Sequence, residues 1–203
     1  MKIICVGWNY PDHNKEMSRT ELPAEPTLFM KPDSAILKDG KPFFIPDFSD
    51  RIEYETEIVI RINRLGKNIA EKFAPRYYDA MTVGIDFTAR DLQQTLREKG
   101  QPWEISKAFD NSAVLGEFIS TEDVDMTKIQ FSMKMNDELR QSACTEEMIF
   151  SINKIISYAS KYFTLKKGDL IFTGTPSGVG RVDINDHIEG YIENNKVLDF
   201  FVK

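Results

Sequence analysis

The stretch that decides the fold reads Tyr54-Glu55-Thr56-Glu57-Ile58-Val59-Ile60-Arg61-Ile62. Successive side chains of a β-strand point to opposite faces, so this alternation predicts a strand. One face carries Glu55, Glu57, Val59 and Arg61, and the other carries Thr56, Ile58, Ile60 and Ile62. The predicted strand therefore presents two carboxylates on the same side.

The pair of Glu55 and Glu57 is a candidate for binding a metal ion. Two residues apart on one strand face, their Cβ atoms lie about 6–7 Å apart. Like charges so placed disfavour joint ionisation unless a cation lies between them, and hard divalent ions prefer carboxylate oxygens. A Glu-x-Glu pair on its own is also typical of the solvent-facing side of a sheet. The pair becomes a metal site only if a third ligand lies nearby.

Asp86 is the candidate third ligand. Its neighbours in the sequence are apolar, and an unpaired carboxylate in such surroundings is costly. Asp86 also precedes a helix predicted to begin near Thr88, so the alternative role of either residue is to cap that helix, and both roles can hold. Arg90, Gln93 and Arg97 recur at i, i+3 and i+7, which gives this helix one polar face.

Short strands dominate the rest of the chain. Strands are predicted at residues 2–6, 129–135, 138–143 and 170–173, with two more in 187–202 and a hairpin over 36–46. Helices are predicted at residues 12–17, 69–78, 89–100 and 146–162. No regular βαβ alternation supports a doubly wound sheet, so the prediction is a mixed, β-rich α/β fold. A length of 203 residues favours a single domain spanning 1–203.

Composition excludes several classes of protein. Lys and Arg total 26 against 32 Asp and Glu, a net charge of -6 with no basic stripe, so nucleic acid is not expected as a partner. Cys5 and Cys144 are too few for a disulfide scaffold. No apolar run reaches 18 residues, so no membrane span is expected, and the chain is interpreted as cytoplasmic.

Several short motifs occur in a fixed order between Val6 and about Gly190. They are Gly7-Trp8-Asn9-Tyr10 followed by His13 and Glu16, Phe29-Met30-Lys31-Pro32, Glu55-Thr56-Glu57, Asp86, Ala89-Arg90-Asp91-Leu92-Gln93, Lys107-Ala108-Phe109-Asp110, Gly168-Asp169 and Thr173-Gly174-Thr175-Pro176-Ser177-Gly178-Val179-Gly180. In this order and spacing the chain resembles the fumarylacetoacetate hydrolase superfamily. Within that superfamily it is most similar to the fumarylacetoacetate hydrolase domain-containing protein 1 type, which comprises acylpyruvate hydrolases and oxaloacetate decarboxylases.

The resemblance implies a fold, a cofactor and an assembly. The implied fold is a twisted β-roll with peripheral helices and a small N-terminal portion, residues 1–45, and the implied assembly is a homodimer. Glu55, Glu57 and Asp86 would hold Mg²⁺ or Mn²⁺, which an all-oxygen ligand set also suits. The small-molecule partner would be a 2-oxo acid.

The resemblance also implies roles for residues around the metal. Lys107 would stabilise negative charge on an enolate. Arg90 and Gln93 would contact the substrate or the water around the metal. Thr175, in the Gly-rich loop, would bind the carboxylate of the 2-oxo acid.

His13 and Glu16 lie three residues apart, so one helical turn can join them as a general-base dyad. Such a dyad suits hydrolysis of an acylpyruvate, in which water attacks the C4 carbonyl. Decarboxylation of oxaloacetate needs no water attack, so one site could serve both reactions. Other activities of the superfamily stay open: fumarylpyruvate hydrolase, decarboxylase/isomerase, 2-oxo-pentenoate hydratase and oxaloacetate tautomerase. A non-catalytic module that binds a 2-oxo acid or metal is a further alternative.

Trp8 departs from the family pattern, which has Arg at that position. Because that Arg lies near the distal end of the substrate in related enzymes, an indole there is expected to favour an apolar or flat distal group over a second carboxylate.

Overall fold

The computed structural model describes residues 1–19 and 21–203, and within them the chain forms fifteen strands, four α-helices and three short 3₁₀ helices. The strands are β1 (Ile3–Gly7), β2 (Thr27–Lys31), β3 (Ile36–Leu37), β4 (Ile52–Tyr54), β5 (Thr56–Ile62), β6 (Tyr78–Asp86), β7 (Thr88–Ala89), β8 (Ala113–Leu115), β9 (Ile119–Ser120), β10 (Gln130–Met135), β11 (Glu138–Cys144), β12 (Leu170–Phe172), β13 (Gly180–Arg181), β14 (His187–Ile192) and β15 (Asn195–Phe201). The helices are α1 (Pro11–Glu16), α2 (Arg90–Glu98), α3 (Glu104–Lys107), α4 (Ile152–Tyr162), η1 (Asp33–Ala35), η2 (Glu71–Tyr77) and η3 (Thr145–Glu147).

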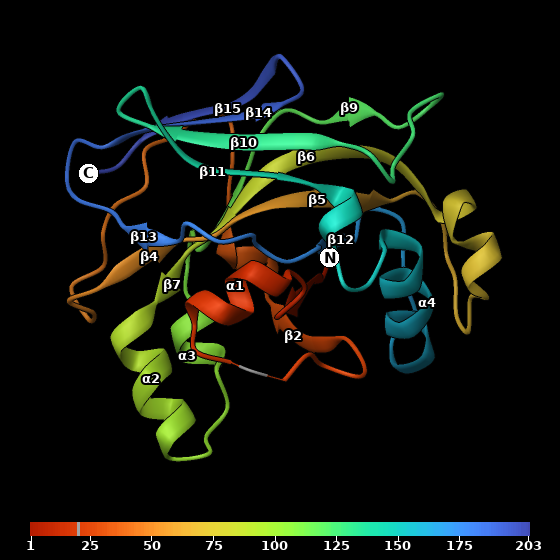
Figure 1. Ribbon diagram of the computed structural model, residues 1–203, viewed down its shortest axis with the longest axis horizontal. Helices are drawn as coiled ribbons and strands as arrows, with labels where there is room; N and C mark the ends of the chain where they lie inside the picture. The colour runs from red at the N-terminus through yellow and green to blue at the C-terminus, as the bar shows by residue number, and fades with distance from the viewer. Residues whose placement is uncertain (20) are drawn as a thin grey trace.

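Three sheets organise these elements. The largest runs β2-β1-β12-β5-β6-β8-β3, with β9 paired to β6, and its parallel pairs are β1 with β12 and β3 with β8. A four-stranded sheet, β11-β10-β14-β15, lies along one side of β5 and β6, while the helices lie around the periphery (Figure 1). The prediction of a β-rich mixed α/β fold, with a curled sheet and few helices, is confirmed.

Strand β5 is buried on both faces because a separate apolar cluster lies on each side of it. Ile58, Ile60 and Ile62 are fully buried in the main core. Val59, on the opposite face, packs in a smaller cluster that also contains Cys5. The two faces of β5, which alternate along the sequence, therefore pack into two different hydrophobic cores. Burial of aliphatic side chains on both faces stabilises this central strand, at about 1.5–3 kcal/mol for each fully buried side chain.

The predicted strand over residues 54–62 is broken at Glu55. Tyr54 ends β4 in a three-stranded sheet, β13-β4-β7, and Thr56 begins β5 in the largest sheet. Between them, the carbonyl of Glu55 accepts a 2.8 Å hydrogen bond from the backbone N–H of Asp86. Glu55 therefore lies at the corner where the chain passes from one sheet to the other.

The predicted hairpin over residues 36–46 is wrong. A turn does form, with positive φ at Asp39 and Gly40, but the segments on its two sides do not pair with each other. Strand β3 pairs in parallel with β8, and Phe43 bridges Val202 near the C-terminus. Apolar partners far away in the sequence bury Phe43 completely, and this outweighs the local turn signal.

Other local predictions are confirmed or corrected at their ends. The strands at residues 2–6, 129–135, 138–143 and 170–173, the two in 187–202, and the helices at 12–17 and 89–100 are confirmed. The predicted helix over 146–162 begins only at Ile152, because Ser151 caps it by accepting a 3.2 Å bond from the Lys154 N–H. The predicted helix over 69–78 is the 3₁₀ helix η2, which contains Pro75.

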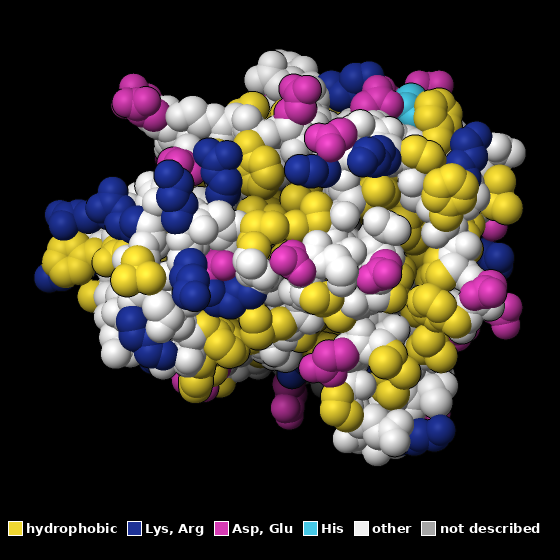
Figure 2. All heavy atoms as spheres, turned by 180° about the vertical axis from the view of Figure 1, so that it is seen from behind, with side chains coloured by type: hydrophobic (Ala, Val, Ile, Leu, Met, Phe, Trp, Pro, Cys, Tyr) yellow, Lys and Arg dark blue, Asp and Glu magenta, His cyan; other side chains and the backbone are white. Residues whose placement is uncertain are grey.

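The surface carries both signs of charge. On the face opposite to that of Figure 1, Lys and Arg side chains are interspersed with Asp and Glu, and hydrophobic side chains gather between them (Figure 2). Within residues 1–19 and 21–203, no helix combines the length and apolar character needed to cross a bilayer.

Candidate metal centre and active site

Three carboxylates converge where β5 and β6 meet the corner at Glu55. Glu57 lies on β5 opposite Gly84 of β6, and Asp86 is the last residue of β6. Antiparallel pairing of these neighbouring strands therefore brings the end of β6 to the start of β5. Glu55, Glu57 and Asp86 each offer one carboxylate oxygen, and these oxygens lie within 4.8 Å of one another. All three residues are buried.

Two buried lysines neutralise Asp86. Lys107 Nζ lies 2.9 Å from Asp86 Oδ2, and Lys31 Nζ lies 2.7 Å from Asp86 Oδ1. The second contact is an ion pair without hydrogen-bond geometry. Asp86 does not cap the following helix, since α2 begins at Arg90 with Ala89 as its N-cap and no side-chain cap bond. The alternative role in capping is therefore wrong for Asp86, whose carboxylate faces the cluster instead.

Glu55 and Glu57 differ in their electrostatic surroundings. Burial by itself raises the pKa of Glu55, but Lys107 and Arg90 more than offset it and lower that pKa below its ordinary value. Burial, Asp86 and Glu55 raise the pKa of Glu57 well above its ordinary value, although the bond from the Gly174 N–H, at 2.6 Å, and the charge of Lys107 act in the opposite direction. The cluster is therefore short of positive charge beside Glu57.

The donor set fits a hard divalent cation. All three side chains supply oxygen, the ligand type that Mg²⁺ and Mn²⁺ favour. A cation between the three oxygens would remove the repulsion that raises the pKa of Glu57. The same cation would also compensate for the burial of Glu57, which, unlike Glu55 and Asp86, pairs with no Lys or Arg among the described residues.

Lys107 and Arg90 hold the cluster in place. Lys107 Nζ donates to Glu55 Oε2 at 2.6 Å and to Thr88 Oγ1 at 2.6 Å. Burial alone lowers the pKa of Lys107, but Asp86 and Glu55 more than offset this and raise it, so the ammonium stays charged. Arg90 donates to Glu55 Oε1, to Glu53 Oε2 and to Gln93 Oε1, each at 2.6 Å.

His13 and Glu16 meet on α1 as the helical spacing predicts. His13 Nδ1 lies 3.1 Å from Glu16 Oε2, and Glu16 Oε1 accepts a 3.0 Å bond from the backbone N–H of Gly178 in the Gly-rich loop. The Glu16 bond engages Nδ1, so Nε2 is the imidazole nitrogen free to exchange a proton. Behind the imidazole lies the indole of Trp8, with ring centroids 5.9 Å apart.

The Gly-rich loop reaches the cluster through close backbone contacts. Gly174 has φ +100°, and a Cβ there would come within 2.7 Å of Asn9 Cβ, so only glycine fits. Thr175 Oγ1 accepts a 2.9 Å bond from Gln141 Nε2, and Gln141 Oε1 accepts from the Thr56 N–H at the start of β5. Gln141 therefore ties the loop to the metal-binding strand.

Asn9 links the segment before α1 to the same loop, and this gives a stability prediction. Its Nδ2 donates to the carbonyls of Phe150 and Thr173 at 3.1 and 2.7 Å, and its Oδ1 accepts from the Phe150 N–H at 2.8 Å. Asn9→Ala is expected to lower the free energy of unfolding by about 2–4 kcal/mol in urea titrations, because buried backbone groups lose their partners. Asn195→Ala, at an exposed position, is the control and should change it by less than about 0.5 kcal/mol. Equal values for the two variants would contradict this role.

Seven of the nine candidate residues line one cavity: His13, Glu55, Glu57, Arg90, Gln93, Lys107 and Thr175. Glu16 lines an adjoining open groove, which shares Arg90 and Gln93 with the cavity. Asp86 lies behind Lys107, fully buried. The structure therefore brings together all nine residues proposed from the sequence.

Sequence reasoning missed three residues of this region. They are Lys31, which belongs to the Phe29-Met30-Lys31-Pro32 motif but received no role, Glu53, which continues the Glu55 and Glu57 spacing by two residues, and Gln141. The alternating glutamates 53, 55 and 57 were a usable signal for Glu53. Nothing in the local sequence indicates that Lys31 pairs with Asp86.

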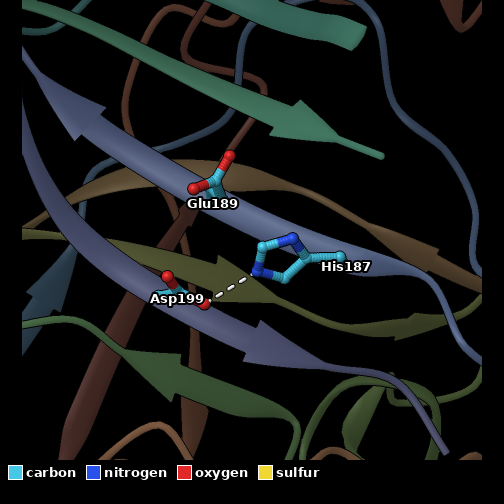
Figure 3. Close-up of side chains that lie close together, drawn as sticks. All are labelled: His187, Glu189 and Asp199. Atoms are coloured by element: carbon cyan, nitrogen blue, oxygen red, sulfur yellow. Dashed lines mark hydrogen bonds and ion pairs between the residues drawn. The ribbon is translucent and has the colours of Figure 1, made fainter. Parts of the chain in front are cut away.

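A second group of metal-type ligands occurs on β14 and β15. His187, Glu189 and Asp199 lie close together at the surface, and His187 Nε2 is 2.8 Å from Asp199 Oδ1 (Figure 3). Lys196 Nζ already bridges Glu189 and Asp199, at 2.9 and 2.6 Å. The protein's own ammonium thus neutralises this group, which is a surface ion-pair network.

Residues 2–200 match the family model described as fumarylacetoacetate (FAA) hydrolase C-terminal. The chain belongs to the fumarylacetoacetate hydrolase family. Among its curated relatives, oxaloacetate tautomerase FAHD1, mitochondrial, of Mus musculus is 42% identical over 202 residues, covering 99% of this chain and 91% of that protein. Oxaloacetate tautomerase YcgM of Escherichia coli is 39% identical, covering 97% of this chain and 92% of that protein.

Solved structures agree with the family assignment. Fumarylpyruvate hydrolase from Pseudomonas aeruginosa, in complex with Mn²⁺ and pyruvate, superposes with a TM-score of 0.94 at 35% identity, covering 100% of this chain and 89% of that one. A fumarylacetoacetate hydrolase family protein from Yersinia pestis superposes with a TM-score of 0.95 at 36% identity, covering 100% and 93%.

Proposed function

We propose that this protein is a divalent-metal-dependent enzyme that cleaves a C–C bond of a small 2-oxo acid, by acylpyruvate hydrolysis, oxaloacetate decarboxylation or both. The observation that carries the proposal is one cavity lined by the metal-type carboxylates Glu55 and Glu57, the Lys107 ammonium and the His13 imidazole. The Mn²⁺ and pyruvate held by the Pseudomonas aeruginosa relative support the same ligand class. We propose that residues 1–203 form one catalytic domain.

In the proposed mechanism, Glu55, Glu57 and Asp86 would hold Mg²⁺ or Mn²⁺. When bound, the cation supplies Lewis-acid polarisation of the 2-oxo acid carbonyl. Lys107 places a fixed positive charge where negative charge develops on the enolate oxygen, in a buried setting that strengthens the interaction. The Thr175 hydroxyl binds the substrate carboxylate, and Arg90 and Gln93 line the side of the cavity toward α2 and contact the substrate or nearby water.

The His13–Glu16 pair supplies the proton transfer. Glu16 accepts the Nδ1–H of His13 and holds the ring so that Nε2 is the basic nitrogen. Nε2 then takes a proton from the water that attacks C4 of an acylpyruvate, the C3–C4 bond breaks, and the pyruvate enolate that leaves takes a proton from solvent. Decarboxylation involves no attack by water and does not use this base.

A second candidate is keto–enol tautomerisation of oxaloacetate, which is favoured by the similarity to the mouse and Escherichia coli oxaloacetate tautomerases. It would use the same carboxylates and Lys107, with His13 moving a proton between C3 and solvent. The alternative that is not an enzyme is a non-catalytic module that binds a 2-oxo acid or metal. Release of pyruvate from acetylpyruvate would exclude that alternative.

Metal dependence is the first test. EDTA treatment should abolish pyruvate release from acetylpyruvate and from oxaloacetate, and Mg²⁺ or Mn²⁺ should restore it. Because a ligand that binds only the native state stabilises it by RT ln(1 + [L]/Kd), a hundredfold excess over Kd should add about 2.7 kcal/mol and raise Tm. Full activity of metal-stripped protein, checked by elemental analysis, would refute the proposal.

We also propose that the protein acts as a homodimer. A groove of about 880 Å³ contains none of the nine candidate site residues and is mainly apolar, including Met1, Phe48 and Ile105. These three side chains are exposed by 59%, 48% and 63%. Exposed apolar surface of this kind is typical of protein–protein interfaces, which supports a contact with a second copy.

A further inference from the structure

The buried amide of Gln141 joins β11 to β5 and to the Gly-rich loop. Gln141 is 1% exposed. Its Oε1 accepts a 2.9 Å bond from the Thr56 N–H, and its Nε2 donates to Thr175 Oγ1 and to the Pro176 carbonyl, each at 2.9 Å. A third acceptor, the Ser177 carbonyl, lies farther away at 3.4 Å. The oxygen and both hydrogens of this amide are therefore engaged within the protein.

The Thr56 N–H fixes which end of the amide faces the loop. A backbone N–H can only donate, so the atom of Gln141 that faces it must be the carbonyl oxygen. A flipped amide would set its NH₂ group against that N–H and its oxygen against the carbonyl of Pro176. Gln141 therefore presents a donor, and not an acceptor, to Thr175.

This donor decides what the Thr175 hydroxyl can do. A hydroxyl carries one hydrogen and accepts through its lone pairs, and here a lone pair already takes the N–H of Gln141. Among the residues that the structure describes, the hydroxyl hydrogen has one acceptor, the Pro176 carbonyl at 3.4 Å, well beyond the usual O–H···O length of about 2.5–3.0 Å. Since Thr175 lines the cavity, this hydrogen is available to a ligand there.

A close backbone approach holds the loop against β11. Gly178 has φ +96°, and a Cβ there would come within 2.4 Å of the Arg140 carbonyl oxygen and 3.3 Å of Gln141 Cγ. Only glycine fits such a position. The loop and β11 therefore keep a fixed separation, which holds the Gln141 donor within reach of Thr175.

We propose that Gln141 is a positioning residue that fixes the Thr175 hydroxyl as a hydrogen-bond donor to the carboxylate of the 2-oxo acid. The inference rests on the proposed function, in which Thr175 binds that carboxylate. A carboxylate offers only acceptors, so a hydroxyl with its hydrogen already free binds it without first losing an internal bond. Affinity for the cation alone should not depend on Gln141, which in the described chain forms no hydrogen bond with a carboxylate.

A double-mutant cycle tests this role, with oxalate binding to the Mg²⁺-saturated protein measured by calorimetry. Thr175→Val removes the hydroxyl at nearly constant volume and should weaken oxalate binding about 10- to 100-fold, as for a hydrogen bond to a charged group. Gln141→Met frees the Pro176 carbonyl to compete for the hydroxyl hydrogen, and should weaken oxalate binding about 5-fold or more. In the Thr175→Val background, Gln141→Met should change it by less than about 2-fold.

Two further variants separate this role from a merely structural one. Thr175→Ser keeps the hydroxyl, so Gln141→Met should weaken oxalate binding in that background about as much as in the wild type. Ser160→Ala is the matched control, because Ser160 is buried and accepts a 2.8 Å bond from the Ile69 N–H but does not line the cavity. It should lower Tm without changing oxalate affinity. Mg²⁺ alone should bind every variant as it binds the wild type.

If Gln141→Met fails to fold because the Thr56 N–H has lost its acceptor, Gln141→Glu takes its place in the cycle. The introduced carboxylate still accepts from the Thr56 N–H but, once ionised, donates nothing to Thr175. Its charge repels oxalate with or without the hydroxyl, so the cycle cancels that repulsion. Because burial favours the protonated carboxyl group, the coupling is measured from about pH 6 to pH 9 and should grow as the pH rises.

Equal weakening by the Gln141 variant with and without the Thr175 hydroxyl would overturn the inference and leave the proposed function intact. A loss of oxalate affinity that only follows a loss of Mg²⁺ affinity would do the same. Unchanged oxalate binding in Thr175→Val would instead contradict the role of Thr175 in the proposed mechanism, and this inference with it. Absence of oxalate binding to the wild type with Mg²⁺ would contradict the proposed function as a whole.

Discussion

Replacing Glu57 by Gln is expected to lower turnover of acetylpyruvate and oxaloacetate together, by about 10³-fold or more, since both reactions depend on the cation that this carboxylate would hold. The amide carbonyl of the introduced glutamine can still accept the bond from the Gly174 N–H, so local geometry is kept. No lysine or arginine loses an ion-pair partner, because among the described residues the basic groups of the cluster pair with Glu55, Asp86 and Glu53. Turnover should be measured at fixed Mg²⁺, with Mg²⁺ affinity determined by calorimetry.

The structure makes Glu57 a cleaner choice than Asp86. Asp86→Ala is expected to disturb the fold as well as the metal site. Its carboxylate contacts both Lys31 and Lys107 in a fully buried setting, so its removal leaves buried ammonium groups without a partner. Breaking a buried pair in this way typically costs about 3–5 kcal/mol, which would confuse loss of metal with loss of fold.

Asp199→Asn is the matched control for Glu57→Gln. It removes one carboxylate from the His187, Glu189 and Asp199 group, the other set of metal-type ligands in the described chain. Mg²⁺ affinity and turnover should stay at the wild-type level. Unchanged Mg²⁺ affinity in Glu57→Gln, or lost affinity in Asp199→Asn, would show that the metal has been assigned to the wrong cluster.

Replacing His13 by Ala is expected to separate the two reactions. Acetylpyruvate hydrolysis should fall by about 10²–10⁴-fold, the usual contribution of a general base, because water must lose a proton to attack C4. Oxaloacetate decarboxylation should fall much less, since CO₂ leaves without a water attack. Glu16→Gln should act in the same direction. It keeps an oxygen for the Gly178 N–H but loses the charge that stabilises the imidazolium.

Controls for His13→Ala address the shape of the site. The imidazole stacks on Trp8, so oxalate affinity must be measured to show that the cavity keeps its form. Lys15→Ala, at an exposed position of the same helix, should leave both rates unchanged. If His13→Ala loses both activities equally while binding oxalate normally, His13 acts in a step that the reactions share, such as protonating the enolate.

Local sequence patterns predicted much of the fold because they report on local geometry. The period of two in residues 56–62 predicted β5. The strands predicted over 129–135 and 138–143 are β10 and β11, and Asn136 and Asp137, which both have positive φ, form the turn between them. The hairpin over 36–46 failed although its turn formed, since Leu37 and Phe43 are buried by partners from β8 and the C-terminus. A turn signal indicates where the chain bends but not which strands pair.

Alternation, helical spacing and the order of motifs were enough to predict the family, the β-rich fold and the nine candidate residues, because all three can be followed along the chain without its three-dimensional structure. How those residues meet depends on the tertiary structure. Lys107 lies 52 residues from Glu55, and Gly174 lies 117 residues from Glu57, yet each pair is joined by a hydrogen bond of 2.6 Å. Likewise, Arg97 of α2 lies 5.1 Å from the centroid of the Trp8 ring, although 89 positions separate the two residues along the chain. Strand register and helix packing set such contacts, and both depend on burial summed over the whole core, which no local period encodes.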